Sequence, residues 1–430
     1  MNPGESDLDT WLRRLETLHP KVVDLGLERI SLVLERLGLD DPQFQVITVA
    51  GTNGKGSTVA MLESLLRGAG RSVAALTSPH LWCFNERVRI NGRMAGDAEL
   101  ISWFEAVEAA RHADALTFFE YTTAAAVLGF QQAGVEIAVL EVGLGGRLDA
   151  VNAIDPDVAI VTSIDLDHQN WLGATRAEIG REKAGIFRPD KPAIVGDPDP
   201  PGTVAAHALA VGAKLFRYGP DFRIEHRAAG LDYVGIAARR SGLPDTAITG
   251  NVAGRNLGCA LAALECLGDD SLPDAGVLTA GLADLQVPGR FQCRQIGGVE
   301  WILDVAHNPA AAANLARQLA VRPPRRTHAL IGMMEDKDAA GLARELANSV
   351  DRWIAVPIDR PRGQDAAALS ARLREGGAGD VRAVDSVEAA CAGLLAEAAN
   401  GDRVVVLGSF YVVAPAAEAL GLYCAAPARG

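Results

Sequence analysis

A glycine-rich segment carries the clearest chemical signal in this sequence. Residues 51–57 read Gly-Thr-Asn-Gly-Lys-Gly-Ser, between an apolar, β-branched run and a run whose apolar residues have helical spacing. Glycines let backbone N–H groups turn toward phosphate oxygens, and the start of a helix adds partial positive charge. We therefore expect a phosphate-binding loop in which Lys55 reaches the outer phosphates of a nucleotide and the Ser57 hydroxyl binds Mg²⁺.

The segment departs from the common phosphate-loop pattern, Gly-x-x-x-x-Gly-Lys-Ser/Thr. Val49 stands where that pattern has its first glycine, and Gly56 separates Lys55 from Ser57. A plain glycine-rich turn is the alternative, but the strand, the lysine and the helix together favour a phosphate loop.

Further polar side chains follow other strand-like runs. Ser78, Glu141 and His168 lie at or just beyond the ends of such runs, and Lys183 lies on a helix-like run nearby. In an open α/β sheet, ligands bind at the carboxyl ends of the strands. Oxygen donors with one imidazole suit Mg²⁺, which takes one or two carboxylates together with phosphate oxygens and water.

Simpler interpretations of these residues remain open. His168 is alternatively a loop or core histidine, and Glu141 a salt-bridge partner. Lys183 is alternatively a lysine that binds phosphate directly. Asp167 competes with His168 as the ligand.

Alternating strands and helices must position these residues. Strands are expected at 45–50, 72–77, 136–142, 158–163 and 192–196, and helices at 57–67, 98–111, 121–132 and 175–184. Strands rich in Val, Ile and Ala that alternate with helices predict a parallel sheet covered on both faces. The pattern then changes, with a β-hairpin expected at 223–226 and 233–236 and a helix at 256–267.

A second alternating series begins near residue 299 and predicts a second α/β domain of ordinary size. Its strands are expected at 301–305, 328–331, 353–356, 381–384 and 403–407, and its helices at 310–319, 339–348, 366–374 and 387–397. Pro288 and Gly289 interrupt the helical pattern and indicate the boundary between the two domains.

Composition excludes several classes of protein. The chain has 430 residues, with 41 Lys and Arg against 54 Asp and Glu, for a net charge of −13. This acidic balance argues against a nucleic-acid-binding surface over the whole molecule, but not against a local basic pocket for an anion. Hydrophobic residues at 49% and charged residues at 22% exclude a largely disordered chain.

The absence of targeting and redox signals predicts a soluble cytoplasmic protein. The acidic start is unlike a signal peptide, and no apolar run approaches the ~18 residues typical of a membrane span. The cysteines form no Cys-x-x-Cys pair or metal-type spacing with histidine. We expect reduced, mostly buried thiols.

The order of residues in the phosphate loop resembles that of the ATP-dependent amide ligases that include the Mur ligases and the folylpolyglutamate synthases. Several further stretches are similar to the folate branch of this family, the bacterial bifunctional dihydrofolate synthase/folylpolyglutamate synthases. These stretches are Ser-Pro-His-Leu at 78–81, Glu-Val-Gly-Leu-Gly-Gly-Arg-Leu-Asp-Ala at 141–150, Asp-His at 167–168, Glu-Lys-Ala-Gly-Ile-Phe at 182–187, Asp-Val-Ala-His-Asn-Pro at 304–309 and Gly-Ser-Phe at 408–410. The resemblance spans nearly the whole chain.

The resemblance implies a P-loop-containing, parallel-sheet ATPase domain followed by a smaller Rossmann-like α/β domain. The first, residues 1–287, binds ATP and the pterin, residues 288–297 are a linker, and residues 298–430 form the glutamate ligase domain. The implied reaction adds L-glutamate to dihydropteroate and to reduced folates through an acyl phosphate. The family default is a monomer.

The resemblance also assigns roles to individual residues. ATP contacts fall on Thr52, Asn53, Gly54, Lys55, Gly56, Ser57, Asn256, Arg290 and Asp304. Two Mg²⁺ sites are implied, one at Ser57 and Ser78 and one at Glu141, His168 and Lys183. Because an ammonium cannot bind a cation, the resemblance implies that Lys183 is carbamylated. The implied catalytic residues are Lys55, His168, Lys183, Asp304 and His307.

The same resemblance implies where the pterin binds. The implied residues are Asp24, Leu25, Gly26, Leu27, Thr117, Phe118, Phe119, Glu120, Leu148, Asp149 and Ala150. Aromatic rings beside carboxylates suit a flat heterocycle with N–H groups at its edge. Without the resemblance, the two phenylalanines would be assigned to the core.

Two rival functions remain. A Mur-type ligase of peptidoglycan precursor synthesis shares the loop and the chemistry, but the pterin-like segments argue against it. A regulatory NTPase switch would hydrolyse ATP slowly without an amino-acid acceptor, whereas a ligase needs all three substrates.

Overall fold

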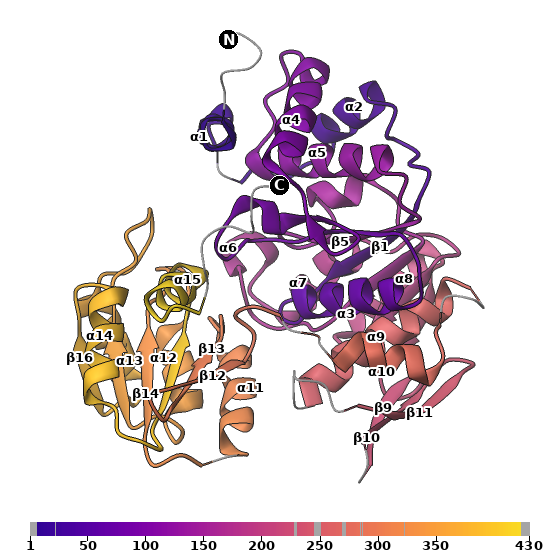
Figure 1. Ribbon diagram of the computed structural model, residues 1–430. Helices are drawn as coiled ribbons and strands as arrows, with labels where there is room; N and C mark the ends of the chain where they lie inside the picture. The colour runs from indigo at the N-terminus through magenta and orange to yellow at the C-terminus, as the bar shows by residue number, and fades with distance from the viewer. Residues whose placement is uncertain are drawn as a thin grey trace. The chain divides into compact units, whose positions relative to one another are not determined.

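The computed structural model describes residues 7–21, 23–227, 230–244, 251–268, 272–283, 285, 287–321 and 323–422. Two compact units make up the chain (Figure 1), Met1–Ala247 with Ala253–Leu285 and Ile248–Val252 with Gln286–Arg429. The predicted limits 1–287 and 298–430 stay a prediction, and the range expected as a linker, 288–297, contains strand β12 (Gln292–Ile296).

An eight-stranded sheet lies at the centre of the first unit, in the order β4-β3-β2-β5-β1-β6-β7-β8. The strands are β1 (Gln45–Ala50), β2 (Val73–Leu76), β3 (Val88–Ile90), β4 (Arg93–Met94), β5 (Ile137–Glu141), β6 (Val158–Val161), β7 (Pro192–Val195) and β8 (Lys214–Arg217). The helices are α1 (Leu8–Leu18), α2 (Glu28–Arg36), α3 (Lys55–Gly68), η1 (Phe84–Arg87), α4 (Asp97–Arg111), α5 (Phe118–Gln132), η2 (Ala150–Ala153), α6 (Gln169–Leu172), α7 (Arg176–Ala184), α8 (Gly202–Val211), most of α9 (Asn251–Cys266) and α10 (Ala275–Ala283).

The parallel strands are buried on both faces, as their apolar sequences predict. Val46 and Ala50 of β1 belong to a core cluster with residues of α1, α2, α4, α5, α7 and α8. Ile47 and Val49 are also fully buried, and strand alternation turns them to the other face. Helix α3 packs against β1, β2 and β5, and Figure 1 shows α5 and α3 on opposite sides of these strands.

Two antiparallel strands extend the predicted parallel sheet of this unit at one edge. Strand β3 pairs antiparallel with β2, and β4 pairs antiparallel with β3. Both strands are short and partly exposed, so neither shows the continuous apolar run of a buried parallel strand.

A separate three-stranded antiparallel sheet replaces the hairpin expected near residue 230. Its order is β11-β10-β9, with β9 (Arg223–Arg227), β10 (Gly230–Val234) and β11 (Arg239–Leu243). The third strand, Arg-Arg-Ser-Gly-Leu, is polar and mostly exposed, which hides it from a hydrophobic pattern.

The second unit is a six-stranded sheet in the order β12-β13-β17-β14-β15-β16. Its elements are β12 (Gln292–Ile296), β13 (Val299–Leu303), β14 (Thr327–Ile331), β15 (Arg352–Ala355), β16 (Asp380–Ala383), β17 (Arg403–Leu407), α11 (Pro309–Ala320), α12 (Ala339–Leu346), α13 (Ala366–Glu375), α14 (Val387–Glu397) and α15 (Phe410–Ala419). Strand β12 pairs antiparallel with β13, and the other pairs are parallel.

The two α/β units confirm the predicted fold class, a parallel-sheet domain that carries a phosphate loop followed by a smaller α/β domain. Within the described residues, no helix combines the length and the apolar character needed to cross a bilayer. The described cysteines are free thiols, Cys259 and Cys391 being buried and Cys293 exposed, while Cys424 lies outside the described residues.

Candidate active site

The glycine-rich loop lies where the sequence analysis places it, between β1 and α3. Gly54 has a left-handed φ of 94° and precedes the first residue of the helix, Lys55. The Lys55 Nζ donates to the carbonyl oxygens of Gly51 at 2.9 Å and Thr52 at 3.3 Å. The lysine is therefore held at the mouth of its own loop, where phosphate oxygens are able to replace those carbonyls.

Two glycines of the loop are required by space as well as by backbone conformation. Gly51 has a φ of 150°, and a Cβ added there would lie 1.9 Å from the Thr162 hydroxyl oxygen. A Cβ added at Gly54 would lie 2.7 Å from the side-chain oxygen of Asn256, a predicted ATP contact. The structure thus brings Asn256, on α9, against a loop about two hundred residues earlier in the chain.

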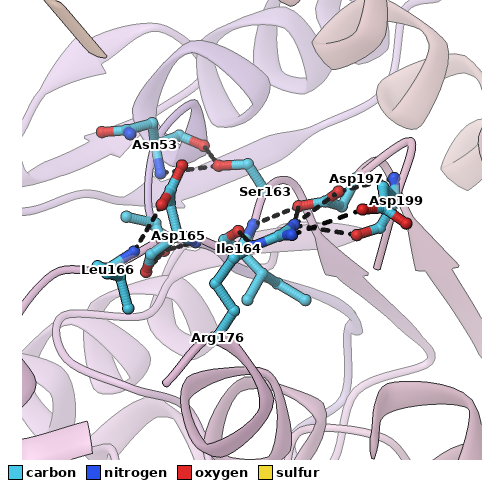
Figure 2. Close-up of polar contacts among 9 residues, drawn as sticks. Asn53, Ser163, Ile164, Asp165, Leu166, Arg176, Asp197 and Asp199 are labelled. Atoms are coloured by element: carbon cyan, nitrogen blue, oxygen red, sulfur yellow. Dashed lines mark hydrogen bonds and ion pairs between the residues drawn. The ribbon is translucent and has the colours of Figure 1, made fainter. Parts of the chain in front are cut away.

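Residues 162–165, directly after β6, support the loop through hydrogen bonds, and we call this supporting segment the mount (Figure 2). The Thr52 N–H donates to the Ser163 carbonyl at 2.8 Å. The Asn53 N–H donates to the Ser163 hydroxyl at 3.0 Å, and that hydroxyl donates to the Asn53 carbonyl at 2.9 Å. The Thr52 hydroxyl accepts from the Asp165 N–H at 3.0 Å and donates to the Asp165 carbonyl at 3.1 Å.

Lys183 is the most unusual ionisable group near this loop. It lies on α7 and is only 4% exposed. Burial, with a smaller contribution from the positive charge of Lys55, lowers the pKa of Lys183 to about 7, although Asp167 and Asp149 oppose the shift. A substantial fraction of Lys183 is therefore a neutral amine near neutral pH, which is the form that reacts with CO₂.

Two of the candidate metal ligands, Ser78 and Glu141, are in direct contact. The Glu141 carboxylate, on β5 and 4% exposed, accepts a hydrogen bond from the Ser78 N–H at 3.1 Å. Ser57 lies on the first turn of α3, and His168, at a φ of 50°, immediately precedes α6. Among the described residues, no group of three or more His, Cys, Asp or Glu side chains has the arrangement of a metal site.

This donor set still fits a hard cation. Hydroxyl oxygens and a buried carboxylate are typical ligands of Mg²⁺, which also keeps several waters. Lys183 fits only as a neutral amine or its carbamate, and its low pKa meets that requirement. The assignment of Ser57, Ser78, Glu141, His168 and Lys183 as ligands stays a prediction.

A cavity of ≈ 180 Å³ gathers most of the predicted pterin residues. The predicted residues that line it are Asp24, Leu25, Gly26, Thr117, Phe119, Glu120, Leu148, Asp149 and Ala150, and the cavity adds Val23, Gly143 and Leu144. Phe118 does not line it, because its ring packs edge-on against Phe84 at 5.9 Å and under the Arg87 guanidinium. Leu27, at the start of α2, also lies outside the lining.

Asp149 joins this cavity to the phosphate loop electrostatically. Its side chain accepts hydrogen bonds from the N–H groups of Leu144 at 2.8 Å and Val151 at 3.1 Å. Burial raises the pKa of Asp149 to about 7, against the opposing effects of these N–H groups and of the Lys55 charge. Lys55 therefore lies close enough to influence both Asp149 and Lys183.

The second unit holds the remaining predicted residues, Arg290, Asp304 and His307. Asp304 follows β13, and its carboxylate accepts from the N–H groups of Phe291 and Ala306, each at 2.8 Å. Burial raises the pKa of Asp304, and the Arg290 charge opposes the shift. His307 Nδ1 lies 2.8 Å from the Val305 carbonyl oxygen. These residues are thus gathered at the end of one strand.

Some residues around the site were not found from the sequence. Thr162, Ser163 and Asp165 support the phosphate loop, and their signal was a run of polar residues directly after an apolar strand. Phe410, whose ring lies 5.3 Å from the Arg290 guanidinium, belongs to the Gly-Ser-Phe stretch, which predicts no role for it.

Comparison with known proteins identifies the class of protein that carries this fold and site. The chain matches the Mur ligase middle domain over residues 49–227 and the Mur ligase glutamate ligase domain over residues 289–410. It is 44% identical over 416 residues to the dihydrofolate synthase/folylpolyglutamate synthase of Escherichia coli (strain K12), covering 96% of each chain. The corresponding Haemophilus influenzae protein is 36% identical over 432 residues, covering 95% of this chain and 96% of the relative. The chain belongs to the dihydrofolate synthase/folylpolyglutamate synthase family.

Solved structures agree with this membership. Escherichia coli FolC in complex with DHPP and ADP superposes with a TM-score of 0.92 at 43% identity, covering 97% of this chain and 98% of that one. The Yersinia pestis bifunctional folylpolyglutamate synthase/dihydrofolate synthase complexed with AMPPNP and Mn superposes with a TM-score of 0.90 at 42% identity, with the same coverage.

Proposed function

We propose that this chain is an ATP-dependent carbon–nitrogen ligase that adds L-glutamate to dihydropteroate and to reduced folates. One observation carries the proposal. Asp149 lines the cavity predicted to hold the pterin and is electrostatically coupled to Lys55 of the phosphate loop. This coupling supports an acceptor position beside the nucleotide site, as transfer of a phosphoryl group to its carboxylate requires.

The first step activates the acceptor. A carboxylate oxygen of the acceptor attacks the γ-phosphorus of ATP, the bond to the β-phosphate oxygen breaks, and an acyl phosphate and ADP form. Lys55 and the N–H groups of the loop stabilise charge on the transferring group. The glutamate amine then attacks the acyl carbon, phosphate leaves, and the amine nitrogen loses its proton.

Divalent cations complete the nucleotide site in this proposal. Ser57 and Ser78 would hold one Mg²⁺ at the phosphates, and Glu141, His168 and carbamylated Lys183 would hold a second. Bound there, the cations supply charge neutralisation at the transferring phosphoryl group. The relatives solved with ADP, or with AMPPNP and Mn, support ATP and a divalent cation as partners.

The domain roles belong to the same proposal. Residues 1–287 bind ATP and the pterin, residues 288–297, which include the predicted ATP contact Arg290, are the linker, and residues 298–430, which include Asp304 and His307, act as the glutamate ligase domain. The chain acts as a monomer. A related structure with Mn, AMPPNP and L-glutamate bound supports glutamate as the amine substrate.

Incorporation of labelled glutamate tests the proposal. The assay contains ATP and Mg²⁺, with dihydropteroate and a reduced folate supplied as separate acceptors. We expect incorporation into both. Incorporation into the folate alone would contradict the proposed dihydropteroate activity. Incorporation into neither acceptor, with ATP still bound, would favour a Mur-type acceptor.

A further inference from the structure

Two charged residues outside the predicted site hold the mount of the phosphate loop. Arg176 is the first residue of α7, and Asp197 follows β7. The Asp197 side chain is 7% exposed, whereas the Arg176 side chain is 38% exposed. The proposed mechanism assigns no role to either residue.

Together these side chains fix the backbone of one residue from both sides (Figure 2). The Ile164 N–H donates to Asp197 Oδ2 at 2.8 Å, and the Ile164 carbonyl accepts from Arg176 Nε at 2.9 Å. The Asp197 carboxylate also accepts from Arg176 Nη2 at 3.3 and 3.4 Å. Asp199 closes the arrangement, because its N–H donates to Asp197 at 2.9 Å and its carbonyl accepts from Arg176 at 3.0 Å.

Ile164 lies between two residues that touch the phosphate loop. Ser163 contacts Thr52 and Asn53, and Asp165 exchanges two hydrogen bonds with the Thr52 hydroxyl. A buried backbone outside a strand needs other partners for its N–H and C=O groups, and side chains are one source of them. The pair supplies them at Ile164, so it sets the position of both neighbours.

The same segment leads to the second candidate metal site. His168 follows Asp165 by three residues, and the charge of Asp167 influences the buried Lys183. A displacement of Ile164 is therefore expected to displace both Thr52 of the loop and the predicted metal ligand His168.

The guanidinium of Arg176 is occupied by the protein itself. Nε and Nη2 bond the carbonyls of Ile164 and Asp199, and Nη1 lies 3.7 Å from the Asp199 carboxylate. Such a planar fork reads several acceptors at fixed angles, which a lysine ammonium does not reproduce. Its geometry indicates a role in holding the backbone rather than in binding a phosphate directly.

We infer that Arg176 and Asp197 are positioning residues for phosphoryl transfer, which hold residues 163–168 in register with the phosphate loop through the backbone of Ile164. The inference rests on the proposed function for its kinetic consequence. Its structural consequence, a correctly placed loop for nucleotide, is measured without turnover.

Arg176→Ala, Arg176→Lys and Asp197→Asn test this inference, with Arg181→Ala as the control from an exposed position on the same helix. We expect Arg176→Ala to lower kcat by about 10²-fold, the cost of a small misplacement of reacting groups. The KM for the folate acceptor should stay within about twofold, because the acceptor cavity does not include the pair. Arg176→Lys should resemble Arg176→Ala, and the double variant with Asp197→Asn should lose little more than the worse single variant.

Chemical rescue separates positioning from general destabilisation. The exposed edge of Arg176 gives a small cation access, so low concentrations of guanidinium chloride should restore Arg176→Ala toward wild-type activity and leave Arg181→Ala unchanged. Calorimetric titration of ADP in EDTA should show a Kd about tenfold higher in Arg176→Ala than in the wild type. A change of this size lies within the range expected for residues in one hydrogen-bond network.

Wild-type kcat and ADP affinity in Arg176→Ala would overturn the inference. So would a loss that guanidinium leaves unchanged and that follows the folded fraction alone in thermal unfolding. A wild-type chain that incorporates no glutamate would instead contradict the proposed function, and the ADP titration would still test the pair.

Discussion

The mount of the phosphate loop and the interior beside it are stabilised by different means. The mount is joined to the loop by backbone and hydroxyl hydrogen bonds of Ser163 and Asp165 with Thr52 and Asn53. The interior beside it buries two ionisable side chains, Asp149 and Lys183, whose pKa values both lie at about 7. The hydrogen bonds between the loop and the first region involve no ionisable side-chain atom, whereas the second region contains two groups with pKa values near neutrality.

This difference suggests a division of labour. Phosphate binding needs N–H groups at fixed positions, and hydrogen bonds between backbone and hydroxyl groups hold the loop in this region. A pterin edge or a reactive amine needs a group with two accessible protonation states. Variants that alter one region should therefore leave the other nearly unchanged.

Removal of the charge at the junction of the two regions should have the largest effect. Lys55→Ala removes the cation that stabilises the transferring phosphoryl group, so we expect kcat to fall by about 10³-fold or more with the fold intact. Glutamate incorporation measures the loss, circular dichroism checks the fold, and Lys191→Ala, a surface ion-pair residue, is the control. Turnover retained in Lys55→Ala would contradict its role.

The contact between the loop and the mount should show the next largest effect, when Gly51 is substituted. Gly51→Ala places a Cβ 1.9 Å from the Thr162 hydroxyl at a φ of 150°, so we expect a loss of about 1–3 kcal/mol in the free energy of unfolding. ADP binding should weaken in the folded fraction. Urea unfolding measures the stability, and Gly202→Ala, where an added Cβ meets nothing within 4 Å, should be close to neutral. Equal effects of the two substitutions would show that the loop tolerates displacement.

Asp149→Asn sharpens the comparison from the other side. The change keeps the size of the side chain but removes its ability to ionise, so we expect the KM for dihydropteroate to rise about tenfold. The KM for ATP should change less, because the substitution affects the electrostatic surroundings of Lys55 but not the hydrogen bonds that hold the loop. Steady-state kinetics with each substrate varied in turn measures both, with the exposed Asp155→Asn as the control. A larger change for ATP than for the acceptor would reverse the assignment of Asp149.

A pH dependence of stability is also expected, spread over several pH units. Burial lowers the pKa of Lys183 from 10.5 to about 7, so between these values the unfolded chain binds the proton and the folded chain does not. The free energy of unfolding therefore rises with pH through this window and falls as pH decreases toward 7. Urea unfolding in CO₂-free buffer should show this slope in the wild type and a weaker one in Lys183→Met. Identical slopes would indicate that Lys183 is not buried as an amine.

The core elements were predictable because each carries a strong local pattern. Strand β1 was predicted with its observed limits, Gln45–Ala50, since a buried parallel strand is a continuous apolar run. Helix α2 was not predicted, and it begins at Glu28 without a side-chain cap that would indicate its start. The short strands β3, β4 and β12 were missed because they are partly exposed and lack such a run.

The candidate site was predictable to the extent that its residues form motifs. The cavity collects most of the predicted pterin residues, but Phe118 turns away because neighbouring residues on a helix face different directions. Arg176 and Asp197 were not predicted, since their partner is the backbone of Ile164 and a backbone contact leaves no residue-type signal.

The mount of the phosphate loop also has a consequence for hydrogen exchange. The amides of Thr52, Asn53, Ile164 and Asp165 each donate to a fixed acceptor, although none belongs to a strand. Loop amides usually exchange with deuterium by local fraying, whereas these should exchange only when the centre of the sheet opens cooperatively. The nucleotide-binding loop is thereby an internal reporter of how often the core of this unit unfolds.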